Sequence, residues 1–222
     1  DLYRIISGTP EKTEIAKTIM KIYLIRHAEA EHLKENWLKK VSYQEFVHLL
    51  LKWENVSLTD EGKIHAEKTA DLLLGKYDII SCSPLLRTRQ TADLLNQHKR
   101  QILFDDSLKE IIIYPPKFLI NMKFSINSWI YICALKSLLS GEIFKLLKEA
   151  KEIYNTILTS GSNNILIVSH SARIRTLILY AHLNSYLKVV KKDYHPCGIS
   201  EVEFCLNCQL DKAKNKILNV ND

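Results

Sequence analysis

The feature that most limits the possible fold is the run "IYLI", Ile22 to Ile25, which is followed directly by Arg26 and His27. A continuous apolar run of this length is typical of a strand that is buried on both faces. Similar runs at Tyr77 to Cys82 and Ile165 to Val168 alternate with helical patterns. This alternation predicts an α/β fold of three layers, α/β/α, in which helices cover both faces of a mainly parallel central sheet.

Capping residues and periodicity predict the other elements. Thr59 is a good N-cap for a helix over Asp60 to Leu74, which Gly75 can close. Ser83 is the expected N-cap of a helix that has Pro84 in its first turn and runs to about Asn96. The remaining expectations are strands over Ile102 to Phe104, Ile199 to Leu206 and Ile217 to Val220, and helices over Ile143 to Leu158 and about Ala172 to Ala181.

A chain of 222 residues is long enough for one sizeable domain with its own core. Met20 directly precedes the first strand, so residues 1–19 are interpreted as an upstream extension of unknown role, and residues 20–222 as the domain. Two segments interrupt the alternation, at about 31–56 and 115–140. The first is amphipathic and is expected to be helical, and both are expected to act as lid segments.

Phe118 to Leu139 is the most apolar part of the chain and is about long enough to cross a bilayer. Charged and amide groups at central positions make such a span unfavourable. A buried or lid-forming helix is therefore expected instead of a membrane span. The interrupting residues are Asn121, Lys123, Asn127, Ser128 and Lys136.

The formal net charge is +6, and the lysines are spread along the chain apart from a small group at Lys188, Lys191 and Lys192. Nucleic-acid binders usually concentrate positive charge on one face or tail. No nucleic-acid partner is therefore expected, although a general attraction to anionic substrates remains.

The five cysteines are an odd number, and no signal peptide is recognised, which favours reduced thiols and a cytoplasmic location. His195, Cys197, Cys205 and Cys208 have a spacing that could hold zinc. A single C-x-x-C is a weak signal, and the favoured interpretation places Cys205 on a strand and Cys208 in the following turn.

Three strand ends carry residues that attract anions. The first strand ends at Arg26 and His27, the stretch "SCSPLLRTRQTA" places Arg87 in a first helical turn, and "ILIVSHSARIRTL" places His170 between a strand and a helix. The carboxyl ends of parallel strands form the ligand-binding edge of an open α/β sheet. Helix N-termini attract anions, and the guanidinium fork can bond two phosphate oxygens at once. The sequence therefore predicts a phosphate pocket.

Four motifs in this order resemble the histidine phosphatase, or phosphoglycerate mutase-like, superfamily. They are "LIRHAEA", "SLTDEG", "SCSPLLRTRQTADLL" and "ILIVSHSARIRTLI", and the late "CGISEVEF" and "ILNVND" look like its closing strands. The resemblance implies that His27 takes the phosphoryl group on an imidazole nitrogen, and that Arg26, Arg87 and His170 neutralise the phosphoryl oxygens. Backbone N–H groups at Ser171 would also bind phosphate. Because the arginines supply the positive charge, no metal or cofactor is expected.

A general acid is also needed to protonate the leaving oxygen. The resemblance places a glutamate shortly after the third strand, and "SLKEI" provides Glu110. Glu29, Asp105 and Asp106 are the alternatives, and Glu110 is favoured because a catalytic acid must reach the leaving group geometrically.

The favoured function is a metal-independent phosphatase that hydrolyses a small phosphorylated substrate, a phosphomonoester, through a phosphohistidine intermediate. A protein phosphohistidine phosphatase, a phosphomutase and a non-catalytic phosphate-binding module are the alternatives. The divergent segments depart from the family pattern and are expected to wall the pocket. Some of their aromatic residues should line its mouth, unless they simply pack into a subsidiary core: Trp37, Phe46, Trp53, Phe118, Phe124 and Trp129.

Overall fold

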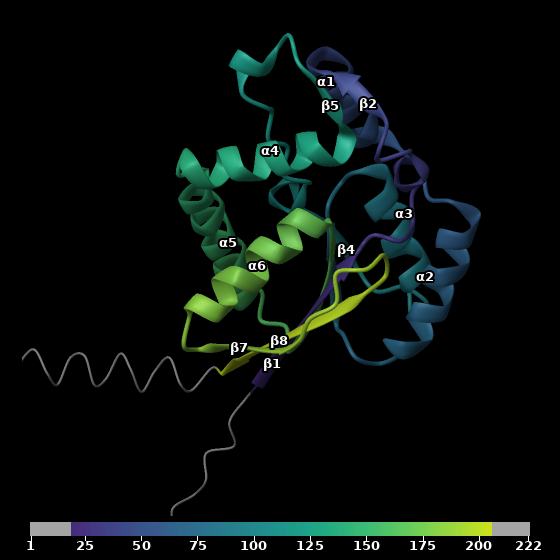
Figure 1. Cartoon of the computed structure of the whole chain (residues 1–222). Coiled ribbons are helices and arrows are strands. Elements are labelled where there is room, and N and C mark those ends of the chain that lie inside the picture. The colour runs from purple at the N-terminus through teal and green to yellow at the C-terminus, as the bar shows by residue number, and fades with distance from the viewer. Residues whose placement is uncertain (1–18, 206–222) are drawn as a thin grey trace, which may run out of the picture.

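The computed structural model describes residues 19–205, which form a six-stranded sheet, a separate two-stranded sheet and the helices around them (Figure 1). The strands of the large sheet follow the order β4-β3-β6-β1-β8-β7. Their bounds are β1 Ile19–Arg26, β3 Ile79–Cys82, β4 Ile102–Phe104, β6 Asn164–Ser169, β7 Leu187–Lys191 and β8 Ile199–Cys205. The expected strand over Ile217 to Val220, Cys208 and residues 1–18 lie outside the described residues.

The large sheet is mainly parallel, which confirms the predicted fold class. Strands β4, β3, β6 and β1 run parallel, with Ile22 of β1 opposite Ile165 of β6. Strand β8 pairs antiparallel with β1, and β7 pairs antiparallel with β8. The sequence did not predict β7, because its lysines read as solvated surface. They lie on an edge strand, where charged side chains are common.

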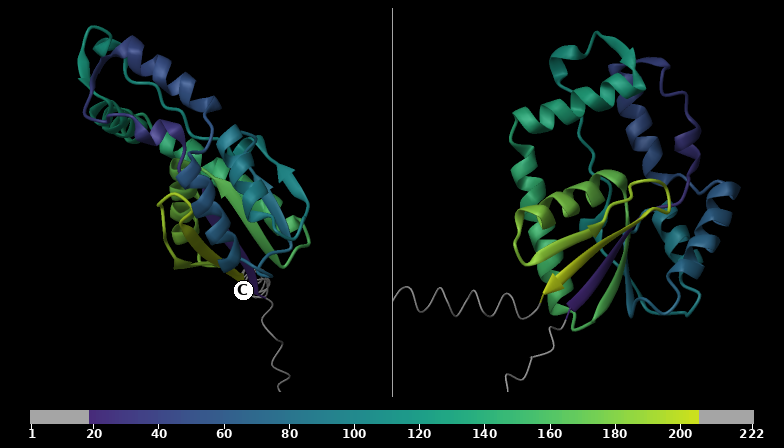
Figure 2. Two further views of the ribbon diagram at one scale, coloured as in Figure 1. Left: turned by 90° about the vertical axis from the view of Figure 1, so that its right-hand side faces the viewer. Right: turned by 60° about the horizontal axis from the view of Figure 1, so that its bottom comes forward.

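Helices cover both faces of this sheet (Figure 2). Alternate residues of β1 point to opposite faces: Ile22 and Leu24 pack with α5 and α6, whereas Tyr23 and Ile25 pack on the side of α2 and α3. This double burial is the reason that the first strand is a continuous apolar run. The helices are α2 Asp60–Leu72, α3 Leu86–Leu95, α5 Glu142–Thr159 and α6 Ser171–Leu183.

Most of the expected helix boundaries are confirmed to within two or three residues. The Thr59 hydroxyl caps α2 by accepting from the Gly62 N–H, and Gly75 has a φ of +70° just after the helix. The start of α3 was predicted wrongly. The helix begins at Leu86 with Leu85 as N-cap, and the Ser83 hydroxyl contacts both the Leu85 N–H and the side chain of His170.

The two divergent segments associate with each other. Strand β2 (Lys40–Ser42) of the first pairs antiparallel with β5 (Lys123–Ser125) of the second. We call residues 31–56 and 115–140 the cap. Figure 1 shows most of the cap at the top of the view, at the end of the molecule away from β7 and β8. Its other elements are η1 Glu31–Lys34, α1 Tyr43–Lys52, η2 Trp53–Asn55, η4 Lys117–Leu119 and α4 Ile126–Leu139. A short η3, Asp106–Leu108, follows β4 in the main body.

The cap has a hydrophobic core of its own. Trp129 and Phe46 are fully buried and stack with ring centroids 5.8 Å apart, and the Trp129 indole N–H donates to the Val41 carbonyl at 3.0 Å. Phe124 packs edge-on against Trp129. Most of the cap aromatics therefore belong to a subsidiary core, whereas Phe118 is 82 % exposed. Among residues 19–205, no helix is long and apolar enough to cross a membrane.

Candidate active site

Three adjacent strands bring the anion-attracting residues to one edge of the sheet. Strands β3, β6 and β1 are neighbours and parallel, so the residues that follow them share the carboxyl edge. His27 follows β1, Arg87 lies in the first turn of the helix after β3, and His170 follows β6. The rings of His27 and His170 lie 5.3 Å apart. The structure therefore brings these predicted residues together.

His27 is held in one orientation by its own backbone. It is 1 % exposed, and its Nδ1 lies 2.7 Å from the Ala28 carbonyl oxygen. A carbonyl can only accept, so Nδ1 carries the proton and Nε2 keeps its lone pair. Burial lowers the pKa of His27 well below its ordinary value, and the nearby Arg87 lowers it further. The imidazole is thus neutral near pH 7, as a nucleophilic nitrogen must be.

Arg26 and Arg87 each donate a hydrogen bond to a backbone carbonyl, and each has a further N–H donor without a partner among the described residues. Nη1 of Arg26 donates to the Tyr194 carbonyl at 3.1 Å, and Nη1 of Arg87 donates to the Trp53 carbonyl at 2.6 Å. The Nε–H of each guanidinium is buried without a partner among the described residues. Buried donors normally have a hydrogen-bond partner, so these two Nε–H groups indicate a binding site for a hydrogen-bond acceptor. Burial lowers the pKa of both arginines, but a guanidinium remains charged.

His170 links the phosphate-facing groups to the candidate acid. Its Nε2 lies 3.0 Å from the Ser83 hydroxyl oxygen, and that oxygen also accepts from the Leu85 N–H. The Ser83 O–H can donate to Nε2, which assigns the ring proton to Nδ1. This Nδ1 has no hydrogen-bond partner within residues 19–205 and lies 3.7 Å from Glu110 Oε2. Burial lowers the pKa of His170 well below its ordinary value, so it is a neutral donor here.

Glu110 is the one candidate acid that faces these groups. Burial raises the pKa of Glu110 above its ordinary value, although Arg87 and Arg26 favour its ionised form. Its side chain is still 28 % exposed, so a substrate can reach the carboxyl group. A carboxyl that retains its proton is suited to general acid chemistry.

The alternative acids are engaged elsewhere. Glu29 Oε1 accepts from the Thr59 hydroxyl at 3.3 Å. Asp105 caps η3 by accepting from the Ser107 N–H, and the exposed Asp106 forms an ion pair with Lys109 at 2.7 Å. Both aspartates have these other partners, whereas Glu110 approaches His170, which makes Glu110 the better placed group.

Two of the sequence motifs position the loop that carries His27. The Thr91 hydroxyl accepts from the Ala28 N–H at 3.0 Å and donates to the Arg87 carbonyl at 2.7 Å. Gly62 packs so closely on the Glu29 backbone that any side chain would collide with the carbonyl. A glycine is therefore needed where helix α2 meets the loop.

Sequence reasoning missed His32, which stands beside the site. Its ring lies 5.6 Å from that of His27 and 5.8 Å from that of Trp53. Burial lowers the pKa of His32 to about 3, and its Nδ1 has no partner among the described residues. The only sequence signal was its position five residues after His27, inside a segment that matched no motif.

Ser171 begins α6, and its hydroxyl accepts from Arg175 Nε at 3.4 Å.

Residues 19–205 contain no group of three or more His, Cys, Asp or Glu side chains placed to hold a metal ion. Of the possible zinc ligands, Cys197 is buried in the core and His195 is exposed. Cys208 lies outside the described residues.

Residues 22–113 match the model of the histidine phosphatase superfamily (branch 1). No curated protein matches the chain. Solved structures do. The chain is similar to phosphoserine phosphatase from Entamoeba histolytica, with 23% identity, TM-score 0.55 and coverage of 82% of this chain and 89% of that one. It is also similar to YhfR of Bacillus stearothermophilus, with 18% identity, TM-score 0.53 and coverage of 82% and 89%.

A third similar structure is called mycobacterial hydrolase 1, with 12% identity, TM-score 0.56 and coverage of 83% and 91%. At these identities the structures establish the fold, and the family match covers the residues from β1 to just beyond Glu110. Residues 22–113 thus match the histidine phosphatase superfamily, and the chain has the phosphoglycerate mutase-like α/β fold of its structural neighbours.

Proposed function

We propose that this protein is a metal-independent phosphatase that hydrolyses a phosphomonoester through a phosphohistidine on His27. The observation that carries the proposal is the hydrogen bond from His27 Nδ1 to the Ala28 carbonyl. It leaves the lone pair of Nε2 available in a buried ring next to Arg87 and His170. An orphaned Nε–H on each arginine provides donors for phosphoryl oxygens.

The reaction has two displacements on phosphorus. In the first, His27 Nε2 forms the N–P bond while the bond from phosphorus to the leaving oxygen breaks, and Glu110 gives its proton to that oxygen. In the second, water attacks the phosphohistidine, the N–P bond breaks, and the Glu110 carboxylate takes the proton from the water. Glu110 is thereby restored to its protonated form.

The cations and N–H donors around His27 act on the phosphoryl oxygens that stay bonded to phosphorus throughout the reaction. Arg26 and Arg87 bind them, and His170 donates from Nδ1. A phosphoryl dianion beside His170 favours its protonated form, so bound substrate raises the pKa of this imidazole. Phosphoryl transfer depends mainly on such positioning and charge stabilisation. This fits a site in which, among residues 19–205, Glu110 is the carboxylate that approaches His170, at 3.7 Å.

The direct test is phosphate release from phenyl phosphate together with acid-quenched labelling from a ³²P-labelled substrate. His27→Gln should remove both the turnover and the acid-labile, base-stable label. His98→Gln, which changes an exposed histidine, is the matched control and should preserve both. Turnover by His27→Gln at a rate near that of the wild type would contradict the nucleophile assignment.

The other functions give different results in the same assay. A non-catalytic module binds inorganic phosphate and releases none from any ester. A phosphomutase transfers the label to a second hydroxyl group instead of water. A protein phosphohistidine phosphatase acts on a phosphorylated histidine protein in preference to phenyl phosphate.

A further inference from the structure

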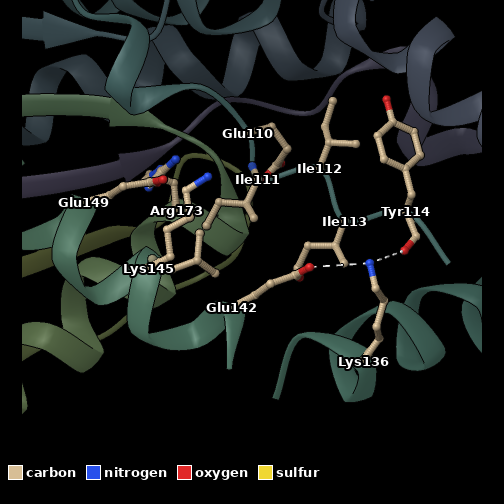
Figure 3. A pocket seen from close by; sticks show the side chains of 11 residues that line it. Glu110, Ile111, Ile112, Ile113, Tyr114, Lys136, Glu142, Lys145, Glu149 and Arg173 are labelled. Carbon is tan, nitrogen blue, oxygen red and sulfur yellow. Dashed lines mark hydrogen bonds and ion pairs between the residues drawn. The ribbon is translucent and has the colours of Figure 1, made fainter. Parts of the chain in front are cut away.

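Two cavities lie on either side of the chain segment that follows Glu110, and their linings differ. Glu110, Ile111 and Ile112 contribute to both. The smaller cavity, of about 70 Å³, is completed by His32, Leu50, Trp53, Glu54 and Arg87. The larger one, of about 330 Å³, faces α4 and α5 and carries several charged side chains (Figure 3). The leaving group of a substrate could occupy either.

The smaller cavity is the one that adjoins the proposed chemistry. It contains Arg87, one of the two phosphate-binding arginines of the proposal, and His32, whose ring lies 5.6 Å from that of His27. Glu110 contributes to its wall, and Oε2 of that residue lies 3.7 Å from His170 Nδ1. A leaving oxygen that receives a proton from Glu110 therefore has this cavity next to it.

The lining of the smaller cavity is mainly apolar. Leu50, Ile111 and Ile112 are half-buried at its wall and Trp53 is buried. No lysine contributes to it. The His32 imidazole is uncharged, since burial lowers its pKa to about 3.

The charges of this cavity also disfavour an anionic leaving group. Arg87 is its one cation, and the proposal assigns that guanidinium to the phosphoryl group. The exposed Glu54 would repel a second negative charge at the mouth.

The larger cavity has the opposite character. Figure 3 shows Lys136 bridging Glu142 and the Tyr114 carbonyl, at 3.4 Å and 3.2 Å. Arg173 forms an ion pair with Glu149 at 2.9 Å. Lys145 has no ion pair among the described residues, so it is the cation that could serve a carboxylate.

We propose, on the basis of the function proposed above, that the substrates are phosphomonoesters of uncharged apolar alcohols, whose aliphatic or aromatic group packs against Trp53, Ile111 and Ile112. Esters whose leaving group carries a carboxylate are disfavoured. This assigns the cap a part in specificity, since Leu50 and Trp53 both belong to it.

The test compares ethyl, butyl and hexyl phosphate with the corresponding esters that end in a carboxylate. Each added methylene that enters the cavity should raise kcat/KM about three- to fourfold, the factor that corresponds to burial of one CH₂ group. The terminal carboxylate should lower kcat/KM by about tenfold or more, because it must be desolvated near Glu54 without a cation.

Substitutions in the lining of each cavity identify the cavity that holds the leaving group. Ile112→Lys should raise kcat/KM for the carboxylate esters relative to the alkyl esters, and Ile112→Ala should reduce the gain per methylene. Ile112→Ala also keeps the test informative if Ile112→Lys fails to fold. Lys145→Ala is the matched control in the other cavity and should leave the ranking unchanged.

Faster turnover of the carboxylate esters that is lost in Lys145→Ala would place the leaving group in the larger cavity and overturn the inference. A flat response to chain length would also overturn it, although the protein would still be a phosphatase. If no ester releases phosphate, including phenyl phosphate, it is the proposed function that fails.

Discussion

The sheet edge and the cap form opposite sides of one site but are built differently. At the sheet edge, each candidate residue ends a strand, directly follows one or lies in the first turn of a helix, so its position depends on local chain direction. These residues are Arg26, His27, Arg87 and His170. The cap is assembled from segments far apart in the chain, joined by the pairing of Lys40–Ser42 with Lys123–Ser125. The proposed function therefore assigns the chemistry to the first region and substrate choice to the second.

Arg87 makes a hydrogen-bonded contact between the two regions. Arg87 of the sheet edge donates to the carbonyls of Trp53 and Glu54, at 2.6 Å and 3.4 Å, where the first cap segment ends. An arginine of the candidate site is therefore oriented partly by the cap backbone. Variants on either side of this contact can separate the two roles.

The largest effect is expected at Arg87. Arg87→Ala removes a charge that stabilises the transferring phosphoryl group, and such arginines contribute about 10³–10⁵-fold to the rate. Arg89→Ala, on the same helix, is the control, because this exposed guanidinium lies over the Phe104 ring at 5.4 Å, away from the site. We expect kcat on phenyl phosphate to fall only in Arg87→Ala, with thermal unfolding confirming that both variants fold. An equal loss of kcat in Arg87→Ala and Arg89→Ala would contradict a catalytic role for the sheet edge.

Glu110→Gln should slow alkyl phosphates by about 10²–10⁴-fold and nitrophenyl phosphate only slightly. An alkoxide needs a proton to leave, whereas an activated phenolate does not. Asp106→Asn, which changes an exposed carboxylate paired with Lys109, should leave both rates unchanged. If Glu110→Gln slows both substrates equally, Glu110 positions the phosphate, and Glu29 and Asp106 become the acids to test.

Trp129→Ala should destabilise the cap core by about 3–5 kcal/mol, because it removes a large, fully buried side chain. Tyr131→Ala is its control on the same helix, since Tyr131 is 75 % exposed. Chemical denaturation measures the effect on stability. Under conditions where the protein is folded, the rate on a small aryl phosphate should change little. A severe loss of that rate would show that the cap takes part in the chemistry.

The smallest effect concerns His32 and pH. In the unfolded chain this imidazole takes up a proton near pH 6.5, but burial lowers its folded pKa to about 3. Protonation therefore favours the unfolded chain, and the folded state loses stability as the pH falls below about 6.5. From pH 7 to pH 5 the wild type should lose about 2 kcal/mol relative to His32→Asn. Urea unfolding at several pH values measures this difference. If the free energies of unfolding of the two proteins change with pH in parallel, the His32 ring is solvated in the folded state.

The helix starts show where local signals sufficed and where they failed. Thr59 was predicted as an N-cap and is one, because the cap hydrogen bond to Gly62 spans only three residues. Ser83 has the same kind of side chain, but its hydroxyl faces His170, which lies 87 residues further along the chain. This hydroxyl thus has a tertiary partner in addition to the Leu85 N–H, and the helix starts later than predicted, at Leu86. Strand β7 was missed because only its pairing with β8 makes a lysine-rich segment a strand.

The sequence alone determined the mainly parallel sheet and the placement of Arg26, His27, Arg87 and His170 at strand ends or helix starts, because apolar runs and capping signals act over a few residues. Tertiary structure decided the rest. It set the tautomer-fixing contact of Ser83 with His170, the approach of Glu110 to that ring, and the place of His32 beside His27. It also paired the two cap segments around one hydrophobic core. These features depend on contacts between distant residues and on burial, which no local pattern encodes.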